Sequence, residues 1–291
     1  MYQDFAENWG PSLARRFGLE QPIVDQWHDD LQLPKSELGH LPDWVELNRA
    51  TRSRIARCKE QWSGETVVCV GNGPSINQMD LSCLDGALIV GTNRAYQLLD
   101  RFTPREFHLV VQDNQRVAEL GQDLRQLKCP LHLGNIYYDQ RGVPPEWVTP
   151  KMRNLSVYMP RLRWQLEEDQ LEPIPDFEPG FSSDPTQFVY YGFSVIFSAI
   201  QFAAYFGAAR IVCIGIDMDY DSGTNFVPGV NVTWDGFSYE YHAKPMFELI
   251  DQKLRKSGIE FINATPRGKV DAIDRMPLAE ALSRKTPRLA A

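Results

Sequence analysis

The spacing of apolar residues changes near residue 63 and divides the chain into two parts. Over residues 1–62 the apolar side chains recur at helical intervals and prolines interrupt them, which predicts a helical N-terminal extension. Over residues 63–291 short apolar runs alternate with longer amphipathic segments. Such runs are typical of strands buried in a parallel sheet, and we expect them at 67–70, 87–90, 107–111, 131–133, 211–214 and 260–262.

The alternation of strands with helices predicts an α/β fold, with a Rossmann-like, mostly parallel sheet covered by helices on both faces. Two segments depart from the alternation. Residues 137–185 are rich in Pro, Trp and Tyr and weakly periodic, which predicts an irregular insertion or cap. Residues 218–238 are polar and aromatic, and since loops of this length inside a compact domain are usually functional, we interpret them as a lid.

The segment 192–216 is nearly uncharged and long enough to cross a bilayer. Gly207 and Arg210 divide it into two pieces of different character. The first piece has the length of a helix over 193–206, and the second is a short strand rich in β-branched residues. We therefore expect no transmembrane segment here.

Charge and cysteine usage disfavour several classes of protein. The formal net charge of −8 would repel a polyanion, so we expect no nucleic-acid partner. The five cysteines are odd in number and include no Cys-x-x-Cys pair, which argues against a disulfide framework and a structural zinc. The N-terminus lacks the basic and apolar regions of a signal peptide. These features predict a reduced, cytoplasmic location.

The first expected core strand runs into a glycine-rich turn made of Gly71, Asn72, Gly73, Pro74 and Ser75. Glycines let a backbone approach a ligand closely and aim its N–H groups at a phosphate. An ordinary tight turn between a strand and a helix is the alternative interpretation. Because Asn72 and Ser75 add hydrogen-bonding side chains, the pattern favours a binding loop for a nucleotide-activated substrate.

Two common nucleotide-binding fingerprints are missing from this turn. Ile76 occupies the position of the third glycine of G-x-G-x-x-G, and no acidic ribose ligand follows the second expected strand. NAD is therefore disfavoured. No Gly-Lys-Ser/Thr is present either, so the chain lacks a Walker-type phosphate loop.

Polar residues also follow the other expected core strands. Asn93 comes directly after the second strand, Asp113 ends the third, and Gly215, Asp217 and Asp219 follow a later one. The carboxyl ends of parallel strands border the ligand crevice of an open sheet, so we expect these residues to surround one binding site. Each aspartate alone could instead cap a turn or a helix, and Asp113, Asp217 and Asp219 together could hold Mg²⁺.

His242 is the histidine whose setting best suits catalysis, because it opens an expected helix directly after the lid loop. Imidazole titrates near neutrality and suits general-base work, although a single histidine is more often a packing or surface residue. His108 and His132 fall within expected strands, and His28 and His40 fall in the N-terminal extension.

The order of these motifs resembles that of the bacterial CMP-sialic-acid sialyltransferases. Gly-Asn-Gly-Pro-Ser is followed by Asn-Arg-Ala-Tyr, then by a helix leading into Gly-Ile-Asp, and then by a histidine and Asn-Ala-Thr. The chain is also similar to the MptE-like 6-hydroxymethylpterin diphosphokinase family. The resemblance covers roughly residues 66–280 and leaves residues 1–62 outside it.

The resemblance to the sialyltransferases implies roles for individual residues. The asparagines that match Asn72 and Asn93 contact the CMP donor, a hydroxyl near the position of Ser194 also faces it, and the histidine that matches His242 is the general base. Those enzymes place two tyrosines after Gly-Ile-Asp to stabilise the leaving phosphate. Tyr220 is the match for the first, offset by one position, and Asn225 stands where the second is expected.

These features favour a glycosyltransferase that moves an acidic sugar from a CMP-sugar donor to a glycan acceptor by inverting displacement. No cofactor is required in this interpretation, in which His242 takes the acceptor proton and Tyr220 donates to the departing phosphate. The alternative is an MptE-like pyrophosphokinase that uses ATP and Mg²⁺ held by Asp113, Asp217 and Asp219. A third interpretation is a nucleotide-binding module without catalysis in a surface-polysaccharide pathway. The sequence leaves the sugar, the acceptor and the oligomeric state open.

Overall fold

A computed structural model describes most of the chain from residue 41 onward. The described residues are 41–136, 145–158, 160–161, 164–165, 176–177, 179–190, 192–219, 225–230 and 238–285. The helices expected within residues 1–40 lie outside the described residues, as do Tyr220 and parts of the expected insertion and lid.

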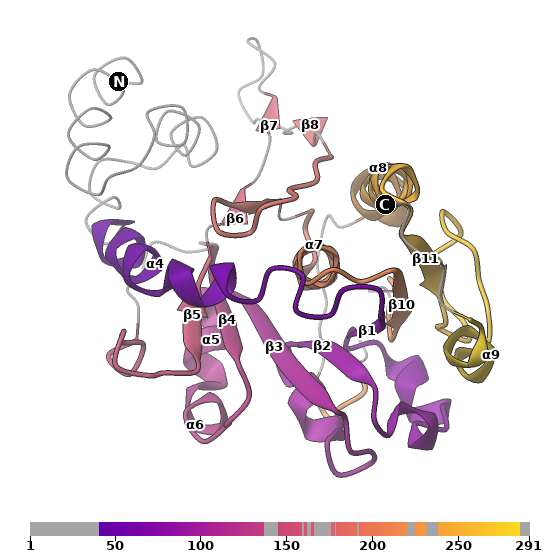
Figure 1. Ribbon diagram of the computed structural model, residues 1–291, viewed down its shortest axis with the longest axis horizontal. Helices are drawn as coiled ribbons and strands as arrows, with labels where there is room; N and C mark the ends of the chain where they lie inside the picture. Colours follow the sequence, from indigo (N-terminus) through magenta and orange to yellow (C-terminus); the bar gives the residue numbers. More distant parts are fainter. Residues whose placement is uncertain are drawn as a thin grey trace.

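Seven parallel strands form the central sheet, in the order β11-β10-β1-β2-β3-β4-β5 (Figure 1). All the expected strands are present, and the Rossmann-like α/β fold is confirmed. The order reverses between β1 and β10, because the chain runs from β1 out to β5 and then returns to the other side of β1. Ligand crevices of open parallel sheets lie at such a reversal. The strands are β1 Thr66–Val70, β2 Leu88–Thr92, β3 Glu106–Asp113, β4 Leu131–Ile136, β5 Leu155–Val157, β10 Arg210–Ile214 and β11 Glu260–Asn263.

The segment 137–185, expected to be irregular, contains β5, which is an edge strand of the sheet. β5 pairs in parallel with β4 and is buried, but its three residues are too few to produce a periodic signal in the sequence. Four further strands, in this segment or just after it, are two residues long each, and they form two separate small pairs. They are β6 Pro160–Arg161, β7 Trp164–Gln165, β8 Asp176–Phe177 and β9 Val189–Tyr190.

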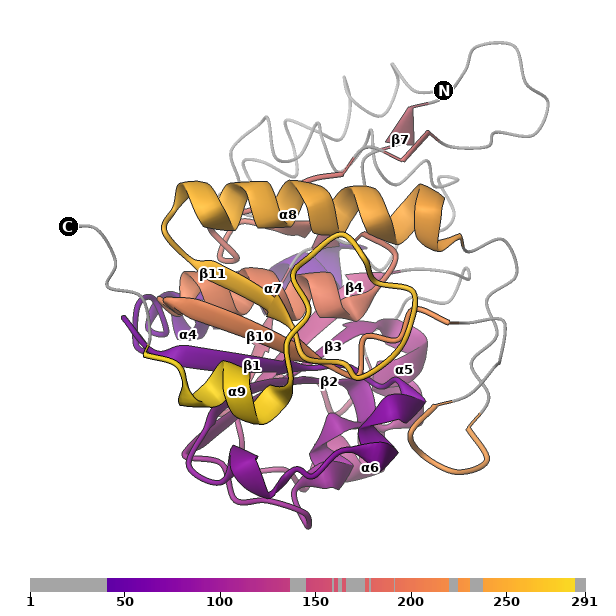
Figure 2. The ribbon, with the colours of Figure 1, turned by 90° about the vertical axis from the view of Figure 1, so that its right-hand side faces the viewer.

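Helices cover both faces of the sheet (Figure 2). α7 lies against β1, β2 and β3, and α8 lies farther out, over α7 and beside β11. α5, α6, α9 and short 3₁₀ turns pack on the opposite face, and α4 packs against the edge strand β5. The helices are α4 Leu41–Ala56, α5 Asn114–Glu119, α6 Gly121–Leu124, α7 Val195–Tyr205, α8 Lys244–Lys256 and α9 Leu278–Ser283.

The central strands are apolar on both sides because each side packs against a covering layer. In β1, Val67 and Cys69 belong to the cluster beneath α7, whereas Val68 and Val70 belong to the cluster on the opposite face. Successive side chains of a strand point to opposite faces, so a strand covered on both faces reads as a continuous apolar run.

The uncharged segment 192–216 folds as expected into a helix followed by a strand, α7 and β10. Gly207 adopts a φ of +93° between them, a conformation that favours glycine. Arg210 is buried at the start of β10, where it pairs with Glu260 at 2.6 Å and donates to carbonyl groups at the end of α9. In the part of the chain that the structure describes, no helix is long and apolar enough to cross a membrane.

A row of buried polar side chains crosses the face of the sheet beneath α7. His108 Nδ1 of β3 lies 2.9 Å from His132 Nε2 of β4, and His132 Nδ1 lies 2.7 Å from Ser156 Oγ of β5. Gln61 Nε2 reaches His108 Nε2 at 3.3 Å, and Ser156 Oγ donates to the Leu131 carbonyl oxygen at 3.3 Å. One direction of donation satisfies the whole row: each imidazole accepts at Nε2 and donates from Nδ1–H. Both histidines are therefore neutral.

We predict that this row makes the fold sensitive to acid. Burial lowers the pKa of His108 to about 4 and that of His132 well below its usual value. In the unfolded chain both titrate near pH ~6.5, so the unfolded state binds protons first as the pH falls. The stability that the two neutral histidines contribute is fully present above pH ~6.5 and is lost as the pH falls. By pH ~4, protonation of His108 in the unfolded chain should alone lower the free energy of unfolding by about 3 kcal/mol.

Urea unfolding across this pH range measures the loss, and NMR of ¹³C-labelled histidine tests its cause. The imidazole signals of His108 and His132 should stay unshifted down to pH ~5. An inflection of either buried histidine near pH ~6.5 would show that the row is not held neutral.

Candidate functional site

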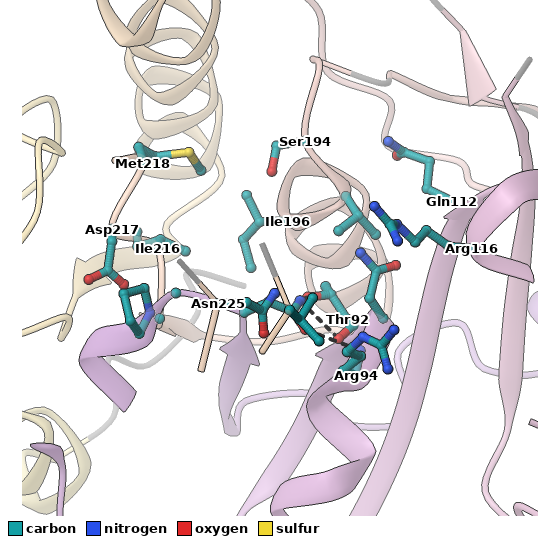
Figure 3. A pocket seen from close by; sticks show the side chains of 18 of the residues that line it. Thr92, Arg94, Gln112, Arg116, Ser194, Ile196, Ile216, Asp217, Met218 and Asn225 are labelled. Atoms are coloured by element: carbon teal, nitrogen blue, oxygen red, sulfur yellow. Dashed lines mark hydrogen bonds between the residues drawn. The ribbon is translucent and has the colours of Figure 1, made fainter. Parts of the chain in front are cut away.

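A pocket of about 340 Å³ opens at the carboxyl ends of β1, β2, β3 and β10, beside the start of α7 (Figure 3). This is the place where the strand order reverses. Ten of the residues expected at a binding site line it: Gly71, Asn72, Gly73, Pro74, Asn93, Asp113, Ser194, Gly215, Asp217 and Asp219. Polar residues that follow different strands are thus brought to one cavity.

The glycine turn joins the ends of β1 and β10. Gly71 N donates to the Ile214 carbonyl oxygen at 2.8 Å, and Gly73 N donates to the Gly215 carbonyl oxygen at 2.8 Å. A Cβ atom on Gly71 would lie 2.3 Å from the Gly215 oxygen, so the two backbones could not approach so closely around a larger residue. The expectation that these N–H groups face a phosphate is not met, because β10 and its exit already accept from them.

Ser75 and Asp217 fasten the same junction. Ser75 is fully buried behind the pocket wall, and its hydroxyl donates to Asp217 Oδ2 at 2.8 Å. Ser75 N lies 3.3 Å from the other carboxylate oxygen. Burial raises the pKa of Asp217, and the hydrogen bonds from Ser75 oppose that rise. Ser75 therefore positions Asp217 and does not itself line the pocket.

Asn72 connects the end of β1 to the end of β2. Its amide nitrogen donates to Thr92 Oγ1 at 2.8 Å, and its Oδ1 accepts from Arg94 N at 3.1 Å. Between them Asn93 takes a left-handed φ of +45°, which few residues other than glycine and asparagine adopt readily. The Asn72 side chain thus holds the β2 exit in a defined shape.

Asn93 carries an acceptor with no protein partner. Among the described residues its Oδ1 is one of the buried side-chain atoms that make no hydrogen bond. A buried polar atom left unpaired costs about 1–3 kcal/mol, which is a large share of a protein's net stability. Since Asn93 lines the pocket, a hydrogen-bond donor on a ligand would remove this cost.

The three aspartates of the magnesium alternative are each engaged by protein groups. Asp113 Oδ1 caps α5 by accepting from Arg116 N at 2.7 Å, and Asp219 pairs with Lys269 at 3.4 Å. Asp217 is held by Ser75 as described above. Within the described ranges no group of three or more His, Cys, Asp or Glu residues is close enough to bind a metal ion. As placed here, the three aspartates do not form the carboxylate cluster that the pyrophosphokinase alternative requires.

Ser194 and Phe193 form the wall at the start of α7. Ser194 stands at the N-cap position, yet its side chain makes no capping hydrogen bond, and it lines the pocket. Phe193 adopts a φ of +60° and packs edge-on against the His242 ring, with centroids 4.6 Å apart. His242 itself is not part of the lining, so the expected base lies one side chain behind the pocket wall.

His242 belongs to a π-helical turn, Tyr239–Ala243, that precedes α8. Its Nδ1 lies 3.0 Å from Ser238 N and 3.2 Å from Ser238 O, so either tautomer finds a partner on the same residue. Burial lowers the pKa of His242, and the hydrogen bond with Ser238 opposes the shift. The imidazole is therefore neutral at pH 7.

Sequence reasoning did not identify the arginines of the pocket, Arg94 and Arg116. Both lie close after strand ends, Arg94 shortly after β2 and Arg116 in the first turn of α5 after β3, and that position was the available signal. The described part of the lid, residues 225–230, also contributes to the lining of the pocket. Phe226 is buried and its N donates to the Asn72 carbonyl oxygen at 3.0 Å, while Asn77 Nδ2 donates to its carbonyl oxygen at 2.7 Å. These bonds fix residues 225–230 over the glycine turn.

Comparisons with known proteins identify no relative of this chain. No protein-family model matches the chain, and neither a curated protein nor a solved structure matches it. The site must therefore be interpreted from its own geometry and from the motifs in the sequence.

We predict that Gly73→Ala destabilises the fold through contact and not through backbone conformation. Gly73 has an ordinary φ of −66°, but a Cβ atom there would lie 1.8 Å from Asp217 Oδ2. Overpacking of this kind costs about 1–3 kcal/mol. Urea unfolding should show this loss, together with a smaller one of roughly 1 kcal/mol for Gly86→Ala, where the φ is +76° and the surrounding space is open. Equal stability of Gly73→Ala and wild type would mean that the junction is not tightly packed.

Proposed function

We propose that this protein is a transferase that uses a nucleotide-activated sugar, with a CMP-sugar carrying an acidic sugar as the first candidate donor. The observation that supports it most is the convergence of four strand ends on one polar pocket, which includes the unpartnered acceptor of Asn93. Small-molecule sites typically have volumes of ~300–1,000 Å³, and the pocket lies within that range.

The polar groups of the pocket suit the parts of a nucleotide. Asn93 Oδ1 can accept from a ribose hydroxyl or from the exocyclic amine of a base. The Ser194 hydroxyl, which does not cap α7, can donate to or accept from the same ligand. Asn72 acts indirectly in this proposal, because its amide is already bonded to Thr92 and Arg94. It would position the β2 exit and not bind the donor through its side-chain amide.

His242 is the proposed general base. In the active tautomer Nδ1–H donates to the Ser238 carbonyl oxygen, which places the unprotonated nitrogen at Nε2. The other tautomer, in which Nδ1 accepts from Ser238 N–H, carries its proton on Nε2 and cannot take one there. Contact between His242 and the acceptor requires the Phe193 ring, which separates the imidazole from the pocket, to move or the acceptor to enter beside it.

The reaction is a single displacement. The acceptor hydroxyl oxygen forms a bond to the anomeric carbon, its proton passes to His242 Nε2, and the bond from that carbon to the phosphate oxygen breaks with inversion. CMP leaves with both electrons of that bond. By resemblance Tyr220 donates to the leaving phosphate, and this residue lies outside the described part of the chain.

A nucleotide-binding module without catalysis is the second candidate, and the position of His242 behind Phe193 favours it. The pyrophosphokinase has less support, because Asp217 and Asp219 are bonded to Ser75 and Lys269. A thermal-shift panel of CMP, CDP, UDP, GDP, ATP with Mg²⁺ and a pterin separates the two CMP-binding candidates from the pyrophosphokinase, and turnover of a CMP-sugar separates those two from each other. A ligand that binds only the folded state raises the melting temperature, so CMP should give the largest shift, whereas a shift confined to ATP with Mg²⁺ or to the pterin would refute the CMP-sugar proposal.

We predict that His242→Asn lowers turnover of a CMP-sugar by about 10²–10⁴-fold while nucleotide affinity stays unchanged. The base must be neutral to work, so wild-type activity should fall as the pH drops through a pKa below the usual value of about 6.5. That acid limb should be absent in His242→Asn. Tyr241→Ala is the matched control, because Tyr241 is the exposed neighbour of His242, 67 % accessible, and should retain both rate and pH profile. An unchanged rate per folded molecule in His242→Asn would mean that His242 is not the base, whereas no turnover in the wild type would leave a binding module as the function.

A further inference from the structure

We propose that Arg94 and Arg116 form the subsite for the phosphate of the ligand, and that Glu119 competes with the phosphate for both guanidinium groups. The inference rests on the proposed function for the identity of the ligand, a nucleotide. The subsite itself follows from the two arginines that line one wall of the pocket (Figure 3).

The backbone fixes where each arginine starts. Arg94 N donates to Asn72 Oδ1 at 3.1 Å, directly after the left-handed Asn93, and Arg116 N donates to Asp113 Oδ1 at 2.7 Å. The two residues follow β2 and β3, which are neighbours in the sheet. Two side chains from adjacent strand ends therefore meet on the same side of the cavity.

Glu119 joins the two arginines. Each of its carboxylate oxygens accepts from one guanidinium, Oε1 from Arg94 and Oε2 from Arg116. The Arg94 side chain is only 16 % exposed, whereas Glu119 is 42 % exposed and does not line the pocket. The two cations thus line the cavity and share the one negative charge of a carboxylate that does not line it.

The remaining donors suit a tetrahedral oxyanion. A guanidinium carries five N–H groups, and among the described residues the guanidinium groups of Arg94 and Arg116 donate to Glu119 alone. Arginine binds phosphate through two parallel N–H bonds, a geometry that a lysine cannot offer. Asp113 is the other carboxylate on this wall, and its Oδ1 is already occupied by Arg116 N.

The opposite wall explains why the phosphate would go to the arginines. Figure 3 shows Arg94 and Arg116 on one side of the pocket and Asp217 on the other. A phosphate beside Asp217 would meet a like charge, and the N–H groups of Gly71 and Gly73 are bonded to the β10 exit. The two arginines therefore face Asp217 across the pocket, and a nucleotide would bind with its phosphate toward the arginines.

The test measures the affinity of cytidine, CMP, inorganic pyrophosphate and a free sugar acid by calorimetry. Arg94→Gln and Arg116→Gln should each weaken the binding of CMP and of pyrophosphate by about 10-fold or more, and the affinity for cytidine should stay unchanged. Arg105→Gln is the matched control, because Arg105 forms an exposed ion pair with Glu65 at the other end of the sheet, outside the pocket lining. It should bind every probe as the wild type does.

Glu119→Gln tests the competition. Removing the carboxylate should strengthen CMP binding by roughly 2- to 5-fold, the size of effect expected from one exposed ion pair. Glu65→Gln is its control and should change nothing. Weaker CMP binding in Glu119→Gln would mean that Glu119 holds the arginines in place, and the competition would be wrong.

The other outcomes separate the subsite from the proposed function. If CMP binds equally well to the wild type and to both arginine variants, the subsite is wrong and the nucleotide proposal stands. If CMP does not bind but pyrophosphate binds through the arginines, the subsite stands and the CMP-sugar proposal fails. If the arginine variants lose only the binding of the free sugar acid, the arginines bind a carboxylate and not the phosphate. If none of the probes binds, the subsite is wrong.

Discussion

The close contact between the ends of β1 and β10 is the constraint on which the pocket depends. At the carboxyl ends of these strands their exits stay joined by Gly71 N to Ile214 O and Gly73 N to Gly215 O, each 2.8 Å long. Only glycine allows that distance, because a Cβ atom at either position would collide with the Gly215 oxygen or the Asp217 carboxylate. With this junction closed, the exits of β2 and β3 form the rest of the cavity wall.

The sequence predicts the sheet well, because strands covered on both faces leave long apolar runs that few other structures produce. It also places the polar strand ends at one edge, since all parallel strands end on the same side. β5 is not predicted, because three residues are too few to show the alternation of apolar and polar positions that marks a strand. The buried pair His108 and His132 is not predicted either, because single polar residues within a strand give no sign that they bond to each other across it.

The site is harder to predict than the fold for a physical reason. A glycine turn looks the same in sequence whether its N–H groups face a ligand or a neighbouring strand, and only the positions of the acceptors decide. Here Ile214 and Gly215 accept from the turn, so the glycines serve the scaffold. The Asn72 amide is likewise bonded to the β2 exit, whereas Asn93 Oδ1, one strand away, has no protein donor. Two asparagines of equal appearance in the sequence thus differ, because the protein occupies the amide of one and leaves an acceptor of the other without a donor.

Because the N–H groups of the glycine turn are bonded within the protein, other residues are expected to recognise an anion. When the backbone of the turn is occupied, the positive charge must come from side chains, and in the proposed subsite Arg94 and Arg116 would supply it from the next two strand ends. Their partner Glu119 offsets one of the two positive charges, which limits the cost of holding Arg94 mostly away from water. The acidic residue at the β10 exit, Asp217, stands on the far wall, where it would repel the phosphate. The scaffold therefore fixes both the cavity and its polarity before any ligand binds.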